Sequence, residues 1–308
     1  MSNSTPFNTL TGEDLNLFTT EQRNAASSDI DIKNSLEIIT VINNEDRKVP
    51  EAVGKILPEI AALIDDIVIA FKKGGRLFYI GAGTSGRLGI LDASECPPTF
   101  GADPEMVQGF MAGGGVAWVK AIEGAEDRGE DGVNELKNAG FNEKDVLVGI
   151  TASGQAPYVI CALEYAAKLG AVTGAISCNS CSKTFNYAKH RLFADVGPEV
   201  VTGSTRMKSG TAQKLILNML TTASMIRLGK VYKNLMVDLK PVNHKLILRS
   251  IRLIREVTGC TEEKAREAFE ASLKQPKVAI VMILKGLDRE HSEIRLKEAD
   301  GLISKVIQ

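Results

Sequence analysis

Short runs of apolar residues recur along the middle of the chain, and segments with a wider apolar spacing separate them. The runs cover residues 76–80, 106–111, 145–150, 171–178 and 192–196, the last being the weakest. A continuous apolar run of this length is typical of a strand that is buried on both faces, as strands of a parallel sheet are. We therefore predict a strand at each run.

The segments between the runs carry the spacing of amphipathic helices. Residues 50–73 place apolar side chains on one face at the 3.6-residue period, and Gly74 then ends the helix. We predict further helices at 158–169 and 211–228. The helix that follows the first strand is expected to end at Cys96-Pro-Pro98, because proline cannot continue it.

The alternation of strands and helices predicts the fold class. Repeated right-handed crossovers build a parallel sheet between two layers of helices. We expect such a doubly wound α/β domain over residues 55–230. Residues 1–54 have the pattern of an N-terminal helical arm, and the charged amphipathic segment 243–308 that of a small helical domain, in which Thr261 and Asp288 are candidate N-caps.

Composition narrows the classes of partner. The 308 residues carry 37 Lys and Arg against 38 Asp and Glu, a formal net charge of -1, so no overall field attracts nucleic acid or an anionic membrane. The longest apolar run, 278–284, is too short to cross a bilayer, and the N-terminus lacks the pattern of a secretory signal. We expect a soluble, cytoplasmic protein without nucleic-acid or membrane partners.

The 5 cysteines are too sparse for a disulfide framework, which indicates reduced thiols. Cys178 and Cys181 form a C-x-x-C pair, but no second pair and no histidine at ligand spacing accompany it. A structural zinc site needs more donors than this pair supplies. We therefore expect no metal site and no redox function at this pair.

The most distinctive stretch, Gly81-Ala-Gly-Thr-Ser-Gly86, lies between the first strand and its helix. Unpaired N–H groups and the helix dipole favour an anion at such a turn. The stretch also satisfies the dinucleotide pattern G-x-G-x-x-G, but the acidic residue expected about 20 positions on is missing, since the second strand leads into glycines. The hydroxyls of Thr84 and Ser85 favour a terminal phosphate instead. A nucleotide site and a purely structural turn remain alternatives.

A second turn of similar chemistry, Thr151-Ala-Ser-Gly-Gln155, follows the strand at 145–150. In open α/β sheets, ligands bind where loops leave the carboxyl ends of the strands. Alone, each turn would be an ordinary connection more often than a site. Together, the two turns predict a site for a sugar phosphate or a similar small anion.

Two pairs of carboxylates lie near the first turn in the sequence. Asp92 and Glu95 share a face of the following helix, and Glu123 and Glu126 lie where an apolar segment becomes charged. Most such acids are simply solvated. A pair beside a substrate could act as general acid and base if burial raised one pKa toward the working pH, which the sequence alone does not show.

Longer blocks carry a resemblance to a known family. The blocks are Thr20-Glu-Gln-Arg-Asn24, the stretch from Gly81 to Thr99, Glu123-Gly-Ala-Glu-Asp127, and the stretch from Gly197 to Lys214. Over nearly its whole length the chain resembles the N-acetylmuramic acid 6-phosphate etherase family of the sugar isomerase (SIS) domain superfamily. The last block is similar to a signature of the glucokinase regulatory protein. The resemblance implies an SIS-type sheet.

The activity that this resemblance implies is cofactor-free cleavage of the D-lactyl ether of N-acetylmuramic acid 6-phosphate, in the recycling of peptidoglycan sugar. Elimination of D-lactate precedes hydration, which gives N-acetylglucosamine 6-phosphate. The family's proton donor falls on Glu95, and its second carboxylate, the expected base, falls on Glu126. The substrate-binding residues that we expect are Thr84, Ser85, Thr151, Ser153, Gly154 and Gln155, although the second turn is the looser match.

The resemblance also implies a homodimer, because a chain with a single SIS domain generally pairs with a second copy. Two other functions stay open on the same scaffold. One is a non-catalytic regulatory protein that binds a sugar phosphate, which the short chain and the two retained glutamates disfavour. The other is a sugar-phosphate isomerase.

Overall fold

The computed structural model describes residues 18–239, 241 and 244–308. They form two compact units. The first consists of residues up to 93 together with 105–220, and the second consists of 94–104 together with 221–308. The domain limits predicted from the sequence, 1–54, 55–230 and 243–308, concern which segments fold independently, and they stay a prediction.

The described residues form one parallel sheet, a short hairpin and many helices. Up to the last strand of the sheet, with η for a 3-10 helix, the elements are η1 (Thr19–Glu21), η2 (Ala25–Ser27), η3 (Ile30–Ile32), α2 (Ser35–Asp46), α3 (Lys48–Gly54), α4 (Leu57–Lys72), β1 (Leu77–Gly81), α5 (Gly83–Phe100), β2 (Val107–Met111), η4 (Gly114–Trp118), η5 (Ala125–Asp127), α6 (Gly129–Asn138), β3 (Val146–Ile150), α7 (Pro157–Lys168), β4 (Val172–Ser177), η6 (Lys183–Tyr187) and β5 (His190–Phe193). The later elements are α8 (Lys208–Arg227), β6 (Val231–Tyr232), β7 (Leu235–Met236), α9 (His244–Thr258), α10 (Glu262–Ala271), α11 (Pro276–Lys285), α12 (Arg289–Glu298) and α13 (Ile303–Ile307).

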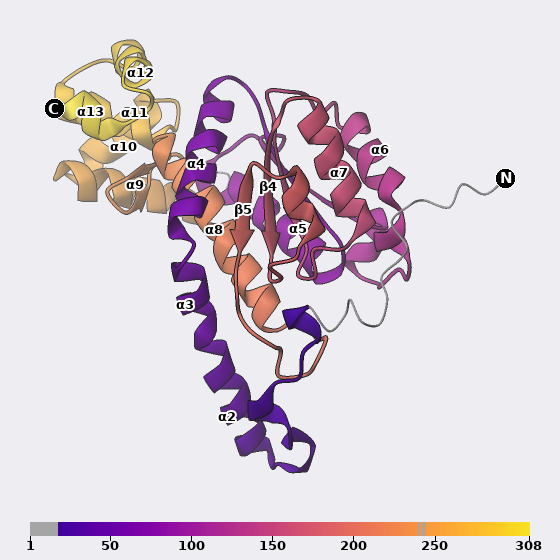
Figure 1. The fold of residues 1–308 in the computed structure, drawn as a ribbon. Coiled ribbons are helices and arrows are strands. Elements are labelled where there is room, and N and C mark those ends of the chain that lie inside the picture. Colours follow the sequence, from indigo (N-terminus) through magenta and orange to yellow (C-terminus); the bar gives the residue numbers. More distant parts are fainter. Residues whose placement is uncertain (1–17, 240, 242–243) are drawn as a thin grey trace. The chain divides into compact units, whose positions relative to one another are not determined.

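The sheet of the first unit is parallel, with the strand order β2-β1-β3-β4-β5. Figure 1 labels the last two strands, β4 and β5, which lie side by side. Each strand lies at or next to a predicted run, so the predicted α/β class with a parallel sheet is confirmed. β1 and β3 are neighbours, and Gly81 lies opposite Ile150 at their carboxyl ends. The two turns that follow these strands therefore leave the same edge of the sheet side by side.

The last strand departs most from its predicted limits. The run at 192–196 predicts it, whereas β5 is His190–Phe193. β5 lies at the edge of the sheet, where a strand is not enclosed on all sides and charged residues are common. His190 accordingly directs its ring to Asp66 of α4, with 2.6 Å between Nε2 and Oδ2.

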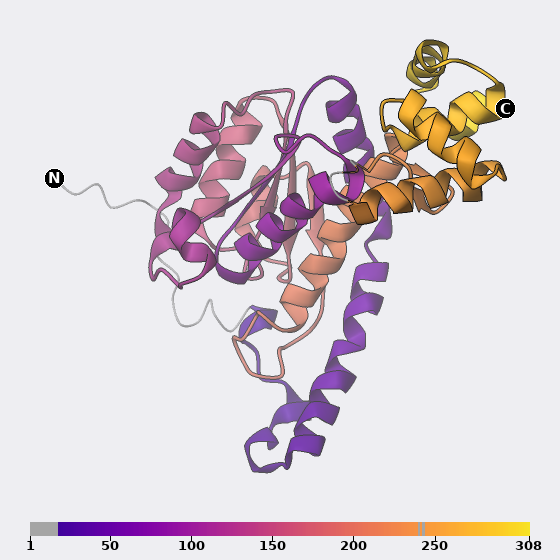
Figure 2. The ribbon, with the colours of Figure 1, turned by 180° about the vertical axis from the view of Figure 1, so that it is seen from behind.

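Helices cover both faces of the sheet, and glycines in the strands let them approach closely. On one face, a Cβ added to Gly149 would stand 2.7 Å from side-chain atoms of Val159 and Leu163 in α7. On the opposite face, a Cβ added to Gly174 would stand 2.8 Å from Leu63 in α4. α5 covers the same face of the sheet as α4. Figure 2, which shows the ribbon from behind, gives a view of this face.

The single helix predicted over 50–73 is wrong, because the chain forms two helices there. α3 ends at Gly54 and α4 begins at Leu57. Inside a continuous helix Pro58 would lack an N–H donor and would clash with the carbonyl of the preceding turn, whereas the first turn of a new helix tolerates it. The predicted apolar face is nevertheless buried along α4, from Ile60 to Phe71.

The predicted helix end at Cys96-Pro-Pro98 is also wrong. α5 continues through Pro97 and Pro98 to Phe100. It ends there because Gly101 adopts a φ of 60° and donates its N–H to the Pro97 carbonyl, 2.9 Å away. Each proline lacks the N–H that would bond the carbonyl four residues earlier, but its fixed φ of about −65° is compatible with the helix.

A buried ion pair joins the N-terminal helices to the start of α8. Lys208 Nζ lies 2.8 Å from Oε2 of Glu45 in α2, and the two side chains are 1% and 4% exposed. Asn24 and Lys48 also donate to the Glu45 carboxylate, at 2.9 Å and 2.6 Å. Burial by itself would raise the pKa of Glu45, but these donors, Lys208 foremost, outweigh it and lower the pKa to about 2.

We expect acid to weaken the first unit through Glu45. Because its pKa is depressed in the folded state, the stability that Glu45 contributes is present above about pH 4.5 and is lost as the pH falls through about 2. At about 1.4 kcal/mol per pKa unit, the loss is on the order of 3 kcal/mol. Urea unfolding across this pH range measures it. Glu45→Gln should flatten the pH dependence by that amount, and an unchanged dependence in this variant would contradict the assignment.

The second unit holds the C-terminal helices and the β6–β7 hairpin. Helices α9 to α13 pack around a shared apolar core. Thr261 and Asp288 are N-caps as predicted, since their side chains accept the N–H groups of Lys264 and His291. The hairpin is absent from the prediction because two residues per strand are too few to show a pattern. No helix among the described residues is long and apolar enough to cross a membrane.

Candidate functional site

Three segments of the first unit meet at the carboxyl edge of the sheet. α5 begins just after β1, the turn at 151–155 follows the neighbouring β3, and the start of α8 lies against α5. A Cβ added to Gly210 of α8 would stand 3.5 Å from Cγ2 of Thr84 in α5. The two turns predicted from the sequence are therefore neighbours, and α8, which lies outside the predicted site, joins them.

The first predicted turn is largely the first turn of α5. β1 ends at Gly81 and α5 begins at Gly83, so Thr84 and Ser85 stand in the helix rather than in a free loop. Gly83 has a φ of 53°, a left-handed conformation that glycine adopts without steric strain. N–H groups in the first turn of a helix have no partner within that helix, and with the dipole they favour an anion.

Ser85 is turned toward α8. Its side chain is buried, and its Oγ donates to Oε1 of Gln213 at 2.9 Å. Thr84, one residue earlier, is only partly buried. Gln213 is not among the site residues predicted from the sequence, and the one signal that points to it is its place in the Gly197–Lys214 block.

That block builds the start of α8. Glu199 is fully buried, and its carboxylate accepts the N–H groups of Lys208 at 3.0 Å and Ser209 at 2.9 Å. It also accepts the hydroxyl of Ser209 at 2.8 Å. A carboxylate at this end of a helix satisfies otherwise unpaired donors and interacts favourably with the dipole. The block therefore fixes the position from which Gln213 reaches Ser85.

The turn at 151–155 is held by its own hydroxyls. Thr151 Oγ1 accepts the N–H of Gly154 at 3.2 Å, and Ser153 Oγ accepts the N–H of Gln155 at 3.3 Å. The two hydroxyl oxygens are 3.4 Å apart, so one can donate to the other. One O–H of the pair is then left to donate to another group, such as an anion.

Two buried amide atoms at this edge of the sheet have no hydrogen-bond partner among the described residues. They are Oε1 of Gln155 and Nε2 of Gln213. Gln155 Nε2 does have a partner, the Cys181 carbonyl at 3.4 Å. Buried polar atoms are nearly always paired, so an unpaired acceptor and an unpaired donor at one edge favour a ligand that carries both kinds of group.

Gly154→Ala is expected to distort the second turn. Gly154 has a φ of 74°, and an added Cβ would stand 2.1 Å from Ser182 Oγ. Left-handed backbone costs about 1 kcal/mol with a side chain, and the clash should raise the loss of unfolding free energy to about 2–4 kcal/mol. Gly170→Ala is the matched control, because Gly170 has a φ of 81° but no atom within 4 Å of an added Cβ. Equal losses in the two variants by urea unfolding would contradict the clash.

A cavity of about 190 Å³ adjoins the start of α5. Gly83 and Arg87 of α5 and Glu126 of η5 are among the residues that line it. Arg87 donates to the carbonyls of Ala117 at 2.8 Å and Trp118 at 3.1 Å, which holds η4 against α5. Glu126 therefore lies beside the predicted phosphate turn, although the two are far apart in the sequence.

Glu126 is open to solvent at this cavity, yet its carboxyl loses part of its hydration there. That loss, and after it the charges of Asp127 and Glu123, raise the pKa of Glu126. A raised pKa makes the ionised carboxylate a stronger base, which is the property that general-base catalysis requires.

The two carboxylates of the other pair differ in their surroundings. Asp92 is buried and accepts hydrogen bonds from the Tyr79 hydroxyl at 3.1 Å and from Asn218 Nδ2 at 2.8 Å, so its role is structural. Glu95 is exposed on α5 and belongs to the second unit. Its joint action with Glu126 stays a prediction.

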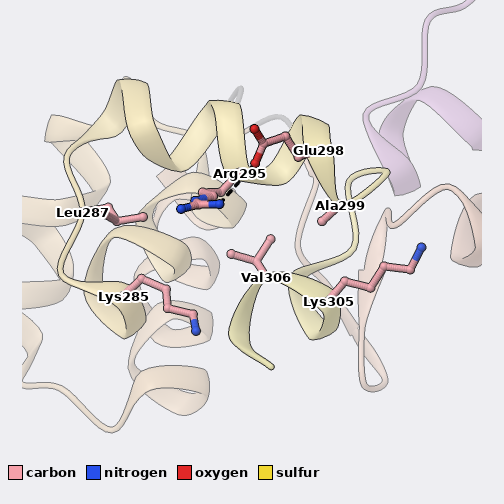
Figure 3. Close-up of a pocket in the computed structure, with 7 residues that line it drawn as sticks. All are labelled: Lys285, Leu287, Arg295, Glu298, Ala299, Lys305 and Val306. Atoms are coloured by element: carbon pink, nitrogen blue, oxygen red, sulfur yellow. Dashed lines mark hydrogen bonds and ion pairs between the residues drawn. The ribbon is translucent and has the colours of Figure 1, made fainter.

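A larger hollow, of about 540 Å³, lies within the second unit and contains none of the predicted site residues (Figure 3). Lys285, Arg295 and Lys305 give it a cationic lining. Arg295 and Lys305 each have an acidic neighbour at 3.4 Å, Glu298 and Asp300. Exposed cations that already have partners are a poorer basis for a specific site than buried unpaired atoms. We therefore take the edge of the sheet as the candidate site.

Profile comparison matches both units to a known regulatory protein. The profile of the glucokinase regulatory protein N-terminal SIS domain matches residues 59–167, and that of the C-terminal lid domain of glucokinase regulatory protein matches residues 233–285. A solved structure of a phosphoheptose isomerase from Francisella tularensis is 20% identical. The match covers 63% of this chain and 100% of the isomerase chain, with a TM-score of 0.49.

Full-length relatives are much closer in sequence. An N-acetylmuramic acid 6-phosphate etherase of Aliivibrio fischeri (strain MJ11) is 53% identical over 294 residues, which are 96% of this chain and 98% of that protein. An N-acetylmuramic acid 6-phosphate etherase 2 of Vibrio cholerae serotype O1 is 53% identical over 288 residues, 94% of each chain. Matches of this length include both units.

Proposed function

Since this chain belongs to the N-acetylmuramic acid 6-phosphate etherase family, we propose that it cleaves the D-lactyl ether of N-acetylmuramic acid 6-phosphate as a carbon–oxygen lyase. The products are N-acetylglucosamine 6-phosphate and D-lactate. The observation that carries the proposal is 53% identity over 96% of the chain. The two hydroxyl-rich turns and the cavity with Glu126 supply groups that such a substrate requires.

In this proposal the phosphate binds at the start of α5. A phosphate dianion only accepts hydrogen bonds, so its site must consist of donors. The first turn of α5 offers backbone N–H groups, and the neighbouring turns offer hydroxyls. The proposed substrate-binding residues are Thr84, Ser85, Thr151, Ser153, Gly154 and Gln155.

The proposed reaction is an elimination followed by a hydration. In the ring-opened sugar, the C1 aldehyde makes the C2 proton acidic. A base removes that proton, the electron pair forms a double bond between C2 and C3, and the bond between C3 and the ether oxygen breaks as that oxygen takes up a proton. Water then adds its oxygen to C3 of the unsaturated aldehyde, and C2 regains a proton.

These steps require one base and one acid, for which we propose Glu126 and Glu95. The raised pKa of Glu126 supports its role as the base that removes the C2 proton. Glu95 would protonate the departing lactate, a role that rests on the family resemblance. The proposed chemistry uses no cofactor.

The proposal includes a homodimer that acts in the cytoplasm in the recycling of cell-wall sugar. Support for a second copy comes from an exposed apolar row in the N-terminal helices. Ile32, Leu36 and Ile39 are 81%, 70% and 59% exposed. Apolar residues so open to solvent and so close together are typical of a contact surface.

Ser85→Ala is expected to weaken binding of N-acetylglucosamine 6-phosphate by about ten- to a hundredfold, because a hydrogen bond to a charged group contributes about 1.5–3 kcal/mol. Calorimetric titration measures the affinity. Ser27→Ala is a matched control, since this buried hydroxyl donates to the Val200 carbonyl at 2.7 Å and has no proposed contact with substrate. Unchanged affinity in the Ser85 variant would count against the phosphate site.

Incubation with N-acetylmuramic acid 6-phosphate tests the proposed function. We expect D-lactate and N-acetylglucosamine 6-phosphate to form in equal amounts. Folded protein that binds the sugar phosphate without releasing lactate would instead be a regulatory protein. Interconversion of aldose and ketose phosphates without lactate would identify an isomerase.

A further inference from the structure

Gln213 has no role in the reaction proposed above, although it is deeply buried beside the proposed phosphate site. Its side chain is 1% exposed and reaches from α8 to α5, where Oε1 accepts the hydroxyl proton of Ser85 at 2.9 Å. Nε2 is buried as well and has no hydrogen-bond partner in the part of the chain that the structure describes. One end of the amide is therefore used and the other is not.

The buried amide nitrogen of Gln213 without a hydrogen-bond partner is energetically unfavourable in this arrangement. Buried N–H groups are almost always paired, and an unpaired N–H is rarer in proteins than an under-satisfied carbonyl oxygen. Gln213 is not loosely held, because the Glu199 carboxylate caps the first residues of its helix. The unpaired nitrogen therefore indicates that Nε2 gains a hydrogen-bond partner in another state of the site, and not that the side chain is poorly packed.

The hydrogen bond from Ser85 also conflicts with phosphate binding. Ser85 has a single hydroxyl proton, which it gives to Gln213 Oε1, whereas a phosphate dianion needs that proton. If the amide of Gln213 turns over, Nε2 takes the place of Oε1 and donates to Ser85 Oγ. The hydroxyl proton of Ser85 is then available for a phosphate oxygen.

We propose that Gln213 is a positioning residue that directs the Ser85 hydroxyl toward the phosphate of the bound sugar by turning over its side-chain amide. The inference rests on the proposed function and deepens its phosphate site. With phosphate bound, Gln213 donates to Ser85 and Ser85 donates to phosphate. The exchange leaves Oε1 unpaired in place of Nε2 and adds a charge-assisted hydrogen bond.

The variant Q213E separates this role from a merely structural one. At about pH 8 its carboxylate still accepts the Ser85 proton, which keeps the contact between α5 and α8, but it cannot donate back. The variant S85A removes the hydroxyl through which Gln213 acts. Calorimetric titration of N-acetylglucosamine 6-phosphate into the wild type, both single variants and the double variant isolates the part of the Gln213 effect that passes through Ser85.

We expect Q213E to weaken affinity by about a hundredfold in the wild-type background, and by no more than about tenfold in the S85A background, where only charge repulsion is left. If Q213E weakened affinity equally in the two backgrounds, or left it unchanged, the proposal for Gln213 would be overturned, but the phosphate site would not. A folded wild type that does not bind the sugar phosphate would overturn the phosphate site itself, and this inference with it.

A second variant covers the case in which Q213E does not fold. Q213M keeps the volume of the side chain but neither accepts nor donates. It should weaken affinity by about tenfold in the wild-type background and hardly at all in the S85A background, while kcat stays within about twofold of its parent's. A drop in kcat at unchanged affinity would contradict a role in phosphate positioning.

Discussion

Glu126→Gln is expected to lower kcat for N-acetylmuramic acid 6-phosphate by at least about 10²-fold, because a positioned general base contributes about 10²- to 10⁴-fold. Gln is close to Glu in size and polarity but cannot take up the C2 proton. Affinity for N-acetylglucosamine 6-phosphate should change little, since the phosphate is held by the turns and not by Glu126. Steady-state kinetics and calorimetric titration give the two quantities.

A neighbouring carboxylate provides the control for this result. Asp127→Asn removes a charge that contributes to the raised pKa of Glu126 but has no proposed contact with substrate. It should alter kcat by less than about threefold and shift the acid limb of the pH profile, which reports the ionisation of Glu126, to lower pH. If Glu126→Gln lost affinity instead of turnover, Glu126 would be a binding or structural residue and the proposed base would be wrong.

Lys208→Met should destabilise the first unit by about 3 kcal/mol, because removing one partner of a buried ion pair leaves the Glu45 carboxylate with only the exposed Lys48 to compensate its charge. Glu45, 4% exposed, would lose its closest buried cation. The start of α8 would lose its tie to α2, so sugar-phosphate affinity should fall as well. Urea unfolding of the folded variant measures the change in free energy.

The double variant Glu45→Gln/Lys208→Met tests the reason for this loss. With both charges gone, no buried carboxylate is left without its buried cation, and at least about half of the lost stability should return. A loss below about 1 kcal/mol in Lys208→Met, or losses that simply add in the double variant, would show that the two groups do not depend on each other.

The strands of the sheet could be predicted from the sequence because a strand buried on both faces leaves a local signature. β1 and β3 match their apolar runs to within one residue. β5 deviates because an edge strand is not fully enclosed, so its limits are set by pairing with β4 and not by its own composition. The errors at Pro58 and at Cys96-Pro-Pro98 both concern prolines: Pro58 lies in the first turn of a new helix, which tolerates it, whereas α5 continues through Pro97 and Pro98.

The site residues that come soon after a strand in the sequence could be predicted from the sequence alone. Thr84 and Thr151 each follow a predicted strand, and parallel strands bring their carboxyl ends to one edge. Gln213 could not be predicted in the same way, because its contact with Ser85 is set by the packing of α8 on α5. The same holds for the approach of Glu126 to the start of α5, which only the cavity shows.

Turnover of N-acetylmuramic acid 6-phosphate in ¹⁸O-labelled water tests the central claim most directly. Elimination followed by hydration breaks the bond between C3 and the ether oxygen, so the oxygen that stays on lactate comes from the substrate. We predict unlabelled D-lactate and N-acetylglucosamine 6-phosphate with ¹⁸O at C3, both identified by mass spectrometry. Label in the lactate, or no lactate from folded protein that binds the sugar phosphate, would contradict the account.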